Sequence, residues 1–249
     1  MSELVAVTLA ERPELDERAS EIADEVWPEY NRHGEITSAH FRRLDTTFPE
    51  FQFVLVDQEA DRGVASACTI PCRWDGTVDG LPAGIDGVLT DAFALREAGG
   101  EPDTLCALAA EVPPAERRAG LSARILLQMR ALAARHGLRA LIAPLRPTEK
   151  VRYPLTPIER YAHWTREDGL PFDAWLRLHV RLGAEILKAE PRSLRITAPV
   201  DDWERWTGMA FPDSGEYVFP EGLAPLSVDR EAGVARYWEP NIWVRHPVS

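Results

Sequence analysis

One segment near the middle of the sequence constrains the fold most. Residues 104–112 form a continuous apolar run, as expected of a buried strand, and Pro113 and Pro114 end it. A helix is predicted from Leu121 to about residue 136, and residues 138–145 form a second apolar strand. A strand, a tight turn, a helix and a second strand in this order make a crossover unit. The two strands are therefore predicted to be parallel neighbours in one sheet of an α/β protein.

The N-terminal part fits the same class. Apolar residues at helical spacing predict a helix over residues 13–27 and a second helix after Thr37. A polar turn that ends in Gly predicts a hairpin between strands at 51–57 and 64–71. Residues 75–102 are rich in Gly and Pro, which predicts a loop-rich insert with one short helix near residues 91–97.

After residue 145 the pattern predicts another loop-like stretch, a helix at 173–187 and then mainly strands. Short strand-like pieces occur at 194–199, 217–219, 224–228, 234–238 and 242–244. Trp203 and Trp206 lie in a short acidic segment that fits a helix, and Glu239-Pro240-Asn241 fits a turn. We therefore expect a single domain over 1–249, with an insert at 75–102 and a C-terminal extension at 193–249.

Composition and charge exclude several classes of protein. The chain has 249 residues, 45% of them hydrophobic, which is enough for a substantial core. Its formal net charge of -12 argues against binding to nucleic acid or to an anionic membrane, since both need clustered positive charge. With no apolar run of transmembrane length and no signal-peptide pattern, the cytoplasm is the expected compartment. Arginine greatly outnumbers lysine, which is typical of a GC-rich bacterial genome.

Cysteine and histidine spacing predicts no metal site. Three cysteines in a chain of this length do not make a disulfide framework, and Cys68 and Cys72 lack the spacing of metal ligands. The six histidines are scattered and match no zinc motif.

The turn before the central helix predicts a phosphate-binding loop. Backbone N–H groups in the first turn of a helix have no intrahelical partner, and the helix dipole adds partial positive charge there. Gly120, just before the helix, allows a ligand to approach the backbone closely. The sequence has neither the Gly-Lys-Ser/Thr of a P-loop nor the Rossmann glycine pattern. A solvated helix start is the alternative for the two arginines that precede Gly120.

This segment resembles the acetyl-CoA motif V-x-P-x-x-[Q/R]-x-x-G-x-[G/A] of the GNAT superfamily of N-acyltransferases. Val112, Pro114, Arg117 and Gly120 match it in register, and Ser122 stands at the last position. The order of elements over about residues 1–190 is also similar to that family. The resemblance implies a GNAT-like α/β fold, in which a twisted mixed sheet is flanked by helices and carries an extended C-terminal strand region. It also implies CoA-binding residues at Val112, Arg117, Arg118, Ala119, Gly120, Leu121, Ser122 and Ala123.

The resemblance implies a catalytic position at His179. Residues 175–183 fit the spacing of the family's A-x-x-x-Y-x-x-x-G, whose Tyr lies near the thiolate leaving group, and His179 takes the place of that Tyr. A His there could protonate the thiolate. The alternative is a core histidine that is satisfied by one hydrogen bond.

The general base is less defined. Some family members carry a Glu on the motif strand, and at the comparable depth this sequence has Cys106. Glu111 is the nearby carboxylate, although a separation of five residues predicts that it lies on the opposite side of the strand from Cys106. Three acidic residues of the insert could also approach a substrate: Asp86, Asp91 and Glu97.

The function implied is transfer of an acetyl or other acyl group from a pantetheine thioester, namely acetyl-CoA or another acyl-CoA, to a small-molecule amine. Two alternatives remain open at this stage. The first has an acyl carrier protein as the donor, and the second is a non-catalytic CoA-binding or sensor protein on the same fold. We expect no metal, no nucleic-acid or membrane partner, and a monomer or a homodimer.

Overall fold

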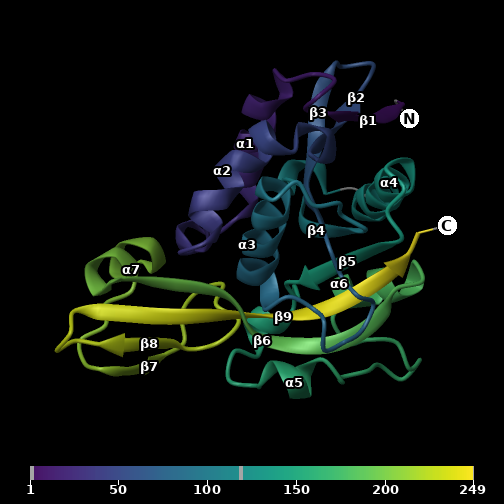
Figure 1. Ribbon diagram of the computed structural model, residues 1–249. Coiled ribbons are helices and arrows are strands. Elements are labelled where there is room, and N and C mark those ends of the chain that lie inside the picture. Colours follow the sequence, from purple (N-terminus) through teal and green to yellow (C-terminus); the bar gives the residue numbers. More distant parts are fainter. Residues whose placement is uncertain (1–2, 118–119, 249) are drawn as a thin grey trace.

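A computed structural model describes residues 3–117 and 120–248 (Figure 1). Its sheet has the strand order β1-β2-β3-β4-β5-β9-β8-β7, and β6 pairs with β9. The strands are β1 (Leu4–Thr8), β2 (Phe53–Asp57), β3 (Arg62–Cys72), β4 (Thr104–Glu111), β5 (Ala140–Leu145), β6 (Glu185–Pro199), β7 (Gly215–Tyr217), β8 (Leu226–Asp229) and β9 (Val234–Pro247). The helices are α1 (Leu15–Val26), α2 (Thr37–Thr47), α3 (Gly84–Glu97), α4 (Leu121–Arg135), α5 (Ile158–Tyr161), α6 (Ala174–Arg181) and α7 (Val200–Thr207), with a 3-10 turn η1 (Glu29–His33) between α1 and α2.

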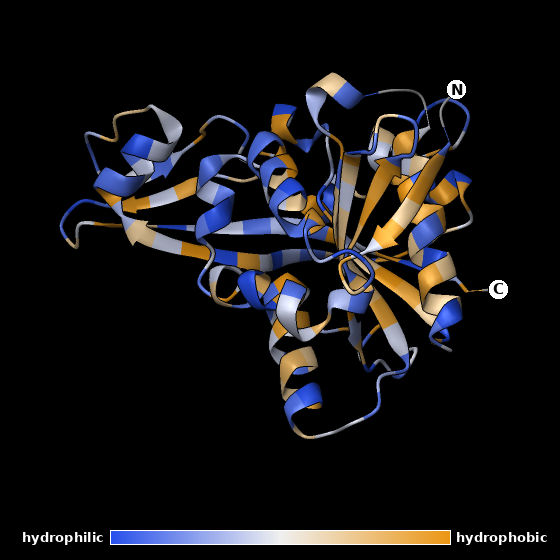
Figure 2. Cartoon of the chain, turned by 90° about the horizontal axis from the view of Figure 1, so that it is seen from above, coloured by the Kyte–Doolittle hydropathy of each residue, from blue (hydrophilic) through white to orange (hydrophobic). Residues whose placement is uncertain are grey.

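The crossover unit is confirmed. β4 and β5 are parallel neighbours, and α4 lies between them in sequence. The other pairings in the sheet are antiparallel, so the sheet is mixed as expected. In Figure 1, α1, α2 and α3 lie on one side of the sheet and α4 lies on the other. Figure 2 shows that the hydrophobic residues gather on the central strands.

Three elements differ from the sequence prediction. β1 was not predicted, because five residues at an edge carry little periodic signal; it pairs with β2. α3 is a full helix of 14 residues, because burial of five apolar side chains outweighs the weak helix propensity of its glycines. The helix predicted at 173–187 ends at Arg181, where Gly183 adopts a φ of +88° and the chain turns into β6.

The C-terminal strand pieces join into two long strands. β6 has 15 residues and β9 has 14, and β9 continues through Glu239 and Asn241, so the turn predicted there is wrong. Beyond the central sheet, residues 194–239 form a projecting arm made of the outer parts of β6 and β9 with α7, β7 and β8 (Figure 1).

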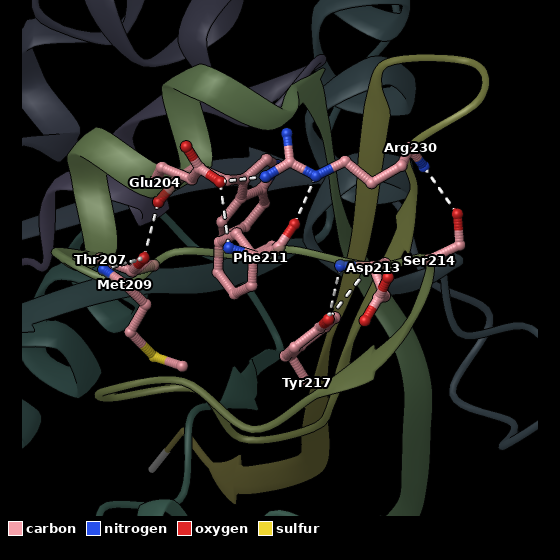
Figure 3. A network of polar contacts seen from close by, with 9 residues as sticks. Glu204, Thr207, Met209, Phe211, Asp213, Ser214, Tyr217 and Arg230 are labelled. Atoms are coloured by element: carbon pink, nitrogen blue, oxygen red, sulfur yellow. Dashed lines mark hydrogen bonds and ion pairs between the residues drawn. The ribbon is translucent and has the colours of Figure 1, made fainter.

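A polar network stabilises the far part of the arm (Figure 3). Arg230, after β8, pairs with Glu204 of α7 and also donates to the carbonyl of Phe211. The same carboxylate accepts a hydrogen bond from the backbone N–H of Phe211 at 3.0 Å. The backbone N–H of Arg230 donates to Ser214 Oγ at 2.9 Å. Arg230 therefore connects α7 to the turn that leads into β7.

The start of α3 caps the open edge of β6. The backbone N–H of Arg195 donates to Asp86 Oδ2 at 2.9 Å, and its carbonyl accepts from the backbone N–H of Glu35 at 3.0 Å. Burial raises the pKa of Asp86 to about 6. The N–H of Ile85 donates to Ser193 Oγ at 3.0 Å. Asp86 thus has a structural role at a strand edge that would otherwise be unpaired.

Gly84 permits this close approach and gives a stability prediction. It has a φ of +68°, and a Cβ at this position would lie 2.2 Å from Ser193 Cα. Gly99 has a similar φ of +66°, but a Cβ there would meet nothing within 4 Å. We expect Gly84→Ala to lose about 1–3 kcal/mol more unfolding free energy than Gly99→Ala, because overpacking adds to backbone strain. Urea denaturation measures both; equal losses would contradict the close packing.

Candidate functional site

β4 and β5 pair only at their beginnings. The register runs from Thr104 opposite Ala140 to Cys106 opposite Ile142. β4 then continues to Glu111 and β5 to Leu145 without further pairing to each other among the described residues, while β3 and β9 still pair with their outer sides. Backbone groups of β4 beyond Cys106 are therefore available on the β5 side. The side chains along this part of β4 are mostly small, with alanine at 107, 109 and 110.

The end of β4 leads directly into the predicted phosphate loop. Gly120 is exposed and has a φ of +97°, and a Cβ at this position would meet nothing within 4 Å. Among the described residues, which exclude 118 and 119, no side chain caps α4, and the first backbone hydrogen bond of the helix joins the N–H of Arg124 to the carbonyl of Gly120 at 2.9 Å. The N–H groups of Leu121, Ser122 and Ala123 thus form the open first turn of a 15-residue helix, which suits an anion.

The remaining residues of the motif are placed as follows. Val112 is half-buried, and Arg117 is exposed at the approach to the loop. Glu116 pairs with Arg62 of β3, with 2.6 Å between Oε1 and Nη2, which fixes the approach to the sheet. Arg118 and Ala119 lie outside the described residues. Their predicted contact with CoA stays a prediction.

A bulge corrects the predicted orientation of Glu111. Cys68 and Thr69 of β3 lie opposite Ala109 and Ala107, so one extra residue, Leu108, is inserted in β4. Glu111 and Cys106 consequently lie opposite Ser66 and Ile70, which are four residues apart in β3. Glu111 therefore lies on the same side of the sheet as Cys106, not on the opposite side.

Glu111 is fully buried on the side of the sheet that α1 covers. One carboxylate oxygen accepts a hydrogen bond from Ser66 Oγ and the other accepts one from Trp27 Nε1, each at 2.6 Å. Burial raises the pKa of Glu111, and these two hydrogen bonds act against the rise. The structure therefore offers a carboxylate on the motif strand, held in place and able to take a proton more readily than an exposed one.

A second carboxyl group lies near Glu111. Burial and the neighbouring Asp16 raise the pKa of Asp45 to about 7. A cavity of about 10 Å³ is lined by Asp45, Ser66 and Cys68 among others, which is about the space of one water. Ser66 in turn donates to Glu111. Ser66, the one-water cavity and Asp45 thus form a polar path from Glu111 toward Asp16, which is exposed on α1.

Arg146, directly after β5, and Glu239, in the middle of β9, form a largely buried ion pair that sequence reasoning missed. Arg146 Nε lies 3.0 Å from Glu239 Oε1, and Arg146 Nη2 donates to Tyr30 Oη at 3.1 Å. Tyr30 packs against three aromatic side chains of the arm, Trp203, Phe219 and Tyr237. The arm is therefore joined to η1 and to the end of β5. The only sequence signal was a single Arg directly after an apolar strand.

His179 is completely buried and does not turn toward the diverging strands. Its Nδ1 lies 2.9 Å from Nε2 of His246, which is also completely buried, and Trp175 packs edge-on against its ring. His246 lies opposite Leu141, where β4 and β5 are still paired. This placement favours the interpretation as a core histidine, and the catalytic role of His179 stays a prediction.

The two buried histidines predict sensitivity to acid. Burial lowers the pKa of His246 to about 4 and that of His179 well below its usual value. Below pH ~6.5 the unfolded chain therefore binds more protons than the folded chain, so the free energy of unfolding falls as the pH drops toward 4. We expect His179→Phe to make this fall shallower and to leave kcat within about twofold of the wild type. Denaturation at several pH values and a thiol-release assay measure the two effects.

His163, which is exposed, supplies the control. His163→Phe should leave the pH dependence of stability unchanged. A loss of kcat of roughly ten- to a hundredfold in folded His179→Phe would instead restore the role as acid.

Comparison with known proteins decides the family. No protein-family profile matches the chain. The arginine N-acetyltransferase avaD of Aspergillus versicolor is 30% identical to it, over 97% of this chain and 93% of the relative. The chain belongs to the GNAT superfamily. The structure agrees with a GNAT fold, since the strands diverge beside a helix that begins at Gly120.

Two solved structures share the GNAT fold over nearly their whole length. The loading GNATL domain of CurA from Lyngbya majuscula has a TM-score of 0.63, and the match covers 99% of this chain and 98% of that domain. The GphF GNAT-like decarboxylase in complex with isobutyryl-CoA has a TM-score of 0.58, with coverage of 99% and 100%. Each is 17% identical to this chain, so these likenesses show the fold alone.

Two further observations bear on cofactors and location. Among residues 3–117 and 120–248, no group of three or more potential ligand side chains is arranged to hold a metal ion. Within the same residues, every helix is too short or too polar to cross a bilayer.

Proposed function

We propose that the chain is an N-acyltransferase that moves an acetyl or other acyl group from acyl-CoA to the amino group of a small cationic amine such as arginine. The observation that carries the proposal is the divergence of β4 from β5 directly before the open first turn of α4. In this arrangement the pyrophosphate lies on the N–H groups of Leu121, Ser122 and Ala123. The pantetheine follows the unpaired edge of β4 toward Cys106.

The chemistry is a direct transfer. The neutral amine nitrogen forms a bond to the thioester carbon, the carbon–sulfur bond breaks, and the thiolate takes up the proton that the acylated nitrogen releases. Holding the two reactants together supplies much of the rate. Unpaired backbone N–H groups of β4 polarise the thioester carbonyl. The ammonium proton leaves through water toward Glu111 and Asp45. Burial raises the pKa of both carboxyl groups, that of Asp45 to about 7, which suits a proton acceptor near neutral pH.

Sequence similarity supports arginine as the first acceptor to test, because the avaD relative is named for acetylation of arginine and the match covers nearly all of both chains. The net charge of -12 also favours the approach of a cation. The same proposal treats residues 1–249 as one acyltransferase domain that works as a monomer or homodimer in the cytoplasm of a bacterium.

A thiol-release assay tests the proposal. Acetyl-CoA is supplied with L-arginine, agmatine, lysine or a neutral amine such as benzylamine, and acyl-carrier protein replaces acyl-CoA in a parallel series. We expect amine-dependent thiol release from acetyl-CoA with arginine above the other acceptors, and the N-acetyl product by mass spectrometry. Turnover with the acyl-carrier protein but not with acetyl-CoA would show that the carrier protein is the acyl donor. CoA binding without turnover of any amine would favour a sensor.

A further inference from the structure

A separate cavity lies at the end of the sheet where β4 and β5 are still paired. It measures about 470 Å³, within the range of small-molecule sites. Its walls come from the loop after β3, the start of β5, the turn between α6 and β6, and the end of β9. The lining residues are Trp74, Gly76, Arg139, Gly183, Arg245 and His246, with Ala140, Glu185, Pro247 and Val248 completing it.

This cavity is distant from the proposed CoA loop. Ala140 lies opposite Thr104, the first residue of β4, whereas the loop follows the last residue of that strand. Eight residues of extended strand span about 23 Å. A ligand here would therefore not share the loop at Gly120.

Basic groups gather around the cavity although the protein is acidic overall. Arg139 and Arg245 line it, and Arg130 of α4 acts electrostatically on His246. The acidic groups nearby are Asp103, paired with Arg139 at 2.9 Å, Glu185, paired with Arg245 at 2.5 Å, and the exposed Asp75, which interacts electrostatically with Arg139. Among the described residues, these two arginines make their recorded contacts through Nη2 only. Their Nε and Nη1 groups are available to a ligand.

The histidine pair supplies an unmet hydrogen bond at the same place. His246 Nε2 bonds to His179, while His246 Nδ1 is buried and has no partner among the described residues. If His179 Nδ1 carries the shared proton, neutral His246 carries its own proton on Nδ1 as an unused donor. A buried donor without an acceptor is unfavourable, and an oxygen ligand in the cavity would satisfy it.

We propose that this cavity binds a small oxyanion, a phosphate or carboxylate group, through Arg139, Arg245 and the imidazole of His246. The two arginines neutralise the anion at the rim, and His246 donates from Nδ1. The negative charge also favours the protonated imidazole. Occupancy would thereby stabilise the end of β9 and, through His179, the end of α6.

Thermal unfolding with added inorganic phosphate tests this site, with sodium chloride used to hold the ionic strength constant. We expect a saturable rise in melting temperature for the wild type. Arg245→Gln should raise the half-saturating phosphate concentration at least tenfold. Arg181→Gln, an exposed arginine of α6 outside the cavity, should behave as the wild type. Acetate in a parallel titration shows whether a carboxylate or a phosphate is the better ligand.

Two further readouts make the test specific. Gly120→Glu should keep the phosphate response; its loss there would assign phosphate to the first turn of α4 and overturn the cavity site. Histidine NMR should show the His246 resonance titrating at higher pH with phosphate present. An unsaturable response, or equal responses in Arg245→Gln and Arg181→Gln, would mean general salt effects only and would also overturn the proposal.

Discussion

Gly120→Glu should weaken CoA binding by at least tenfold, which corresponds to about 1.4 kcal/mol. Three features combine at this position. The added carboxylate would lie beside the pyrophosphate, its side chain would fill space that is now open, and a φ of +97° is unfavourable for a residue with a Cβ. Isothermal titration calorimetry with CoA measures the effect on the folded variant.

Gly208→Glu is the matched control. Gly208 ends α7 in the arm, has a φ of +66°, and would also place a Cβ in open space. It carries comparable backbone strain and the same new charge, away from α4. Unchanged CoA affinity in folded Gly120→Glu would remove the phosphate-loop assignment.

Glu239→Ala should lower the unfolding free energy by about 3–5 kcal/mol, because it leaves the Arg146 guanidinium buried without its carboxylate. For a chain of this size, that corresponds to a fall in melting temperature of roughly 6–20 °C. Differential scanning calorimetry measures it. Since Tyr30 and the arm meet at the same pair, we also expect the arm to become more susceptible to proteolysis.

Two comparison variants separate burial from charge. Arg146→Met combined with Glu239→Leu should recover much of the loss, because removing both charges leaves none unpaired. Glu14→Ala breaks an exposed pair with Arg12 and should leave the melting temperature unchanged. A Glu239→Ala protein that melts with the wild type would contradict the prediction and show that Tyr30 Oη and the carbonyl of Glu221, which also accept from Arg146, are sufficient partners.

The crossover unit could be predicted because its signals are local: an apolar run, a proline stop, a glycine and a periodic helix. α3 could not be predicted at its full length, since Gly84 and Gly87 argue against a helix and contacts with β3, β6 and α2, distant in sequence, outweigh them. The full length of β9 could not be predicted for the same reason, because pairing with β5 and β6 continues the strand through Pro240.

The candidate site likewise has one part that could be predicted from the sequence and one part that could not. The motif placed Gly120 at the start of α4, where local geometry is sufficient. The orientation of Glu111 depends on the unpaired residue Leu108, which the pairing of β4 with β3 creates, and the partner of His179 is 67 residues away. Neither follows from spacing within one element. Counting residues along a strand assumes a regular ladder, and the bulge at Leu108 breaks that assumption.

The bulge at Leu108 also bears on how such chains diverge. Loss of Leu108 alone would restore a regular ladder, in which Cys106 and Glu111 are four residues apart and still lie opposite Ile70 and Ser66. The carboxylate would then keep its hydrogen bonds to Ser66 and Trp27. A relative one residue shorter in this strand would therefore carry the same proton acceptor. An alignment without a gap at Leu108 would place that glutamate opposite Ala110 and hide the correspondence.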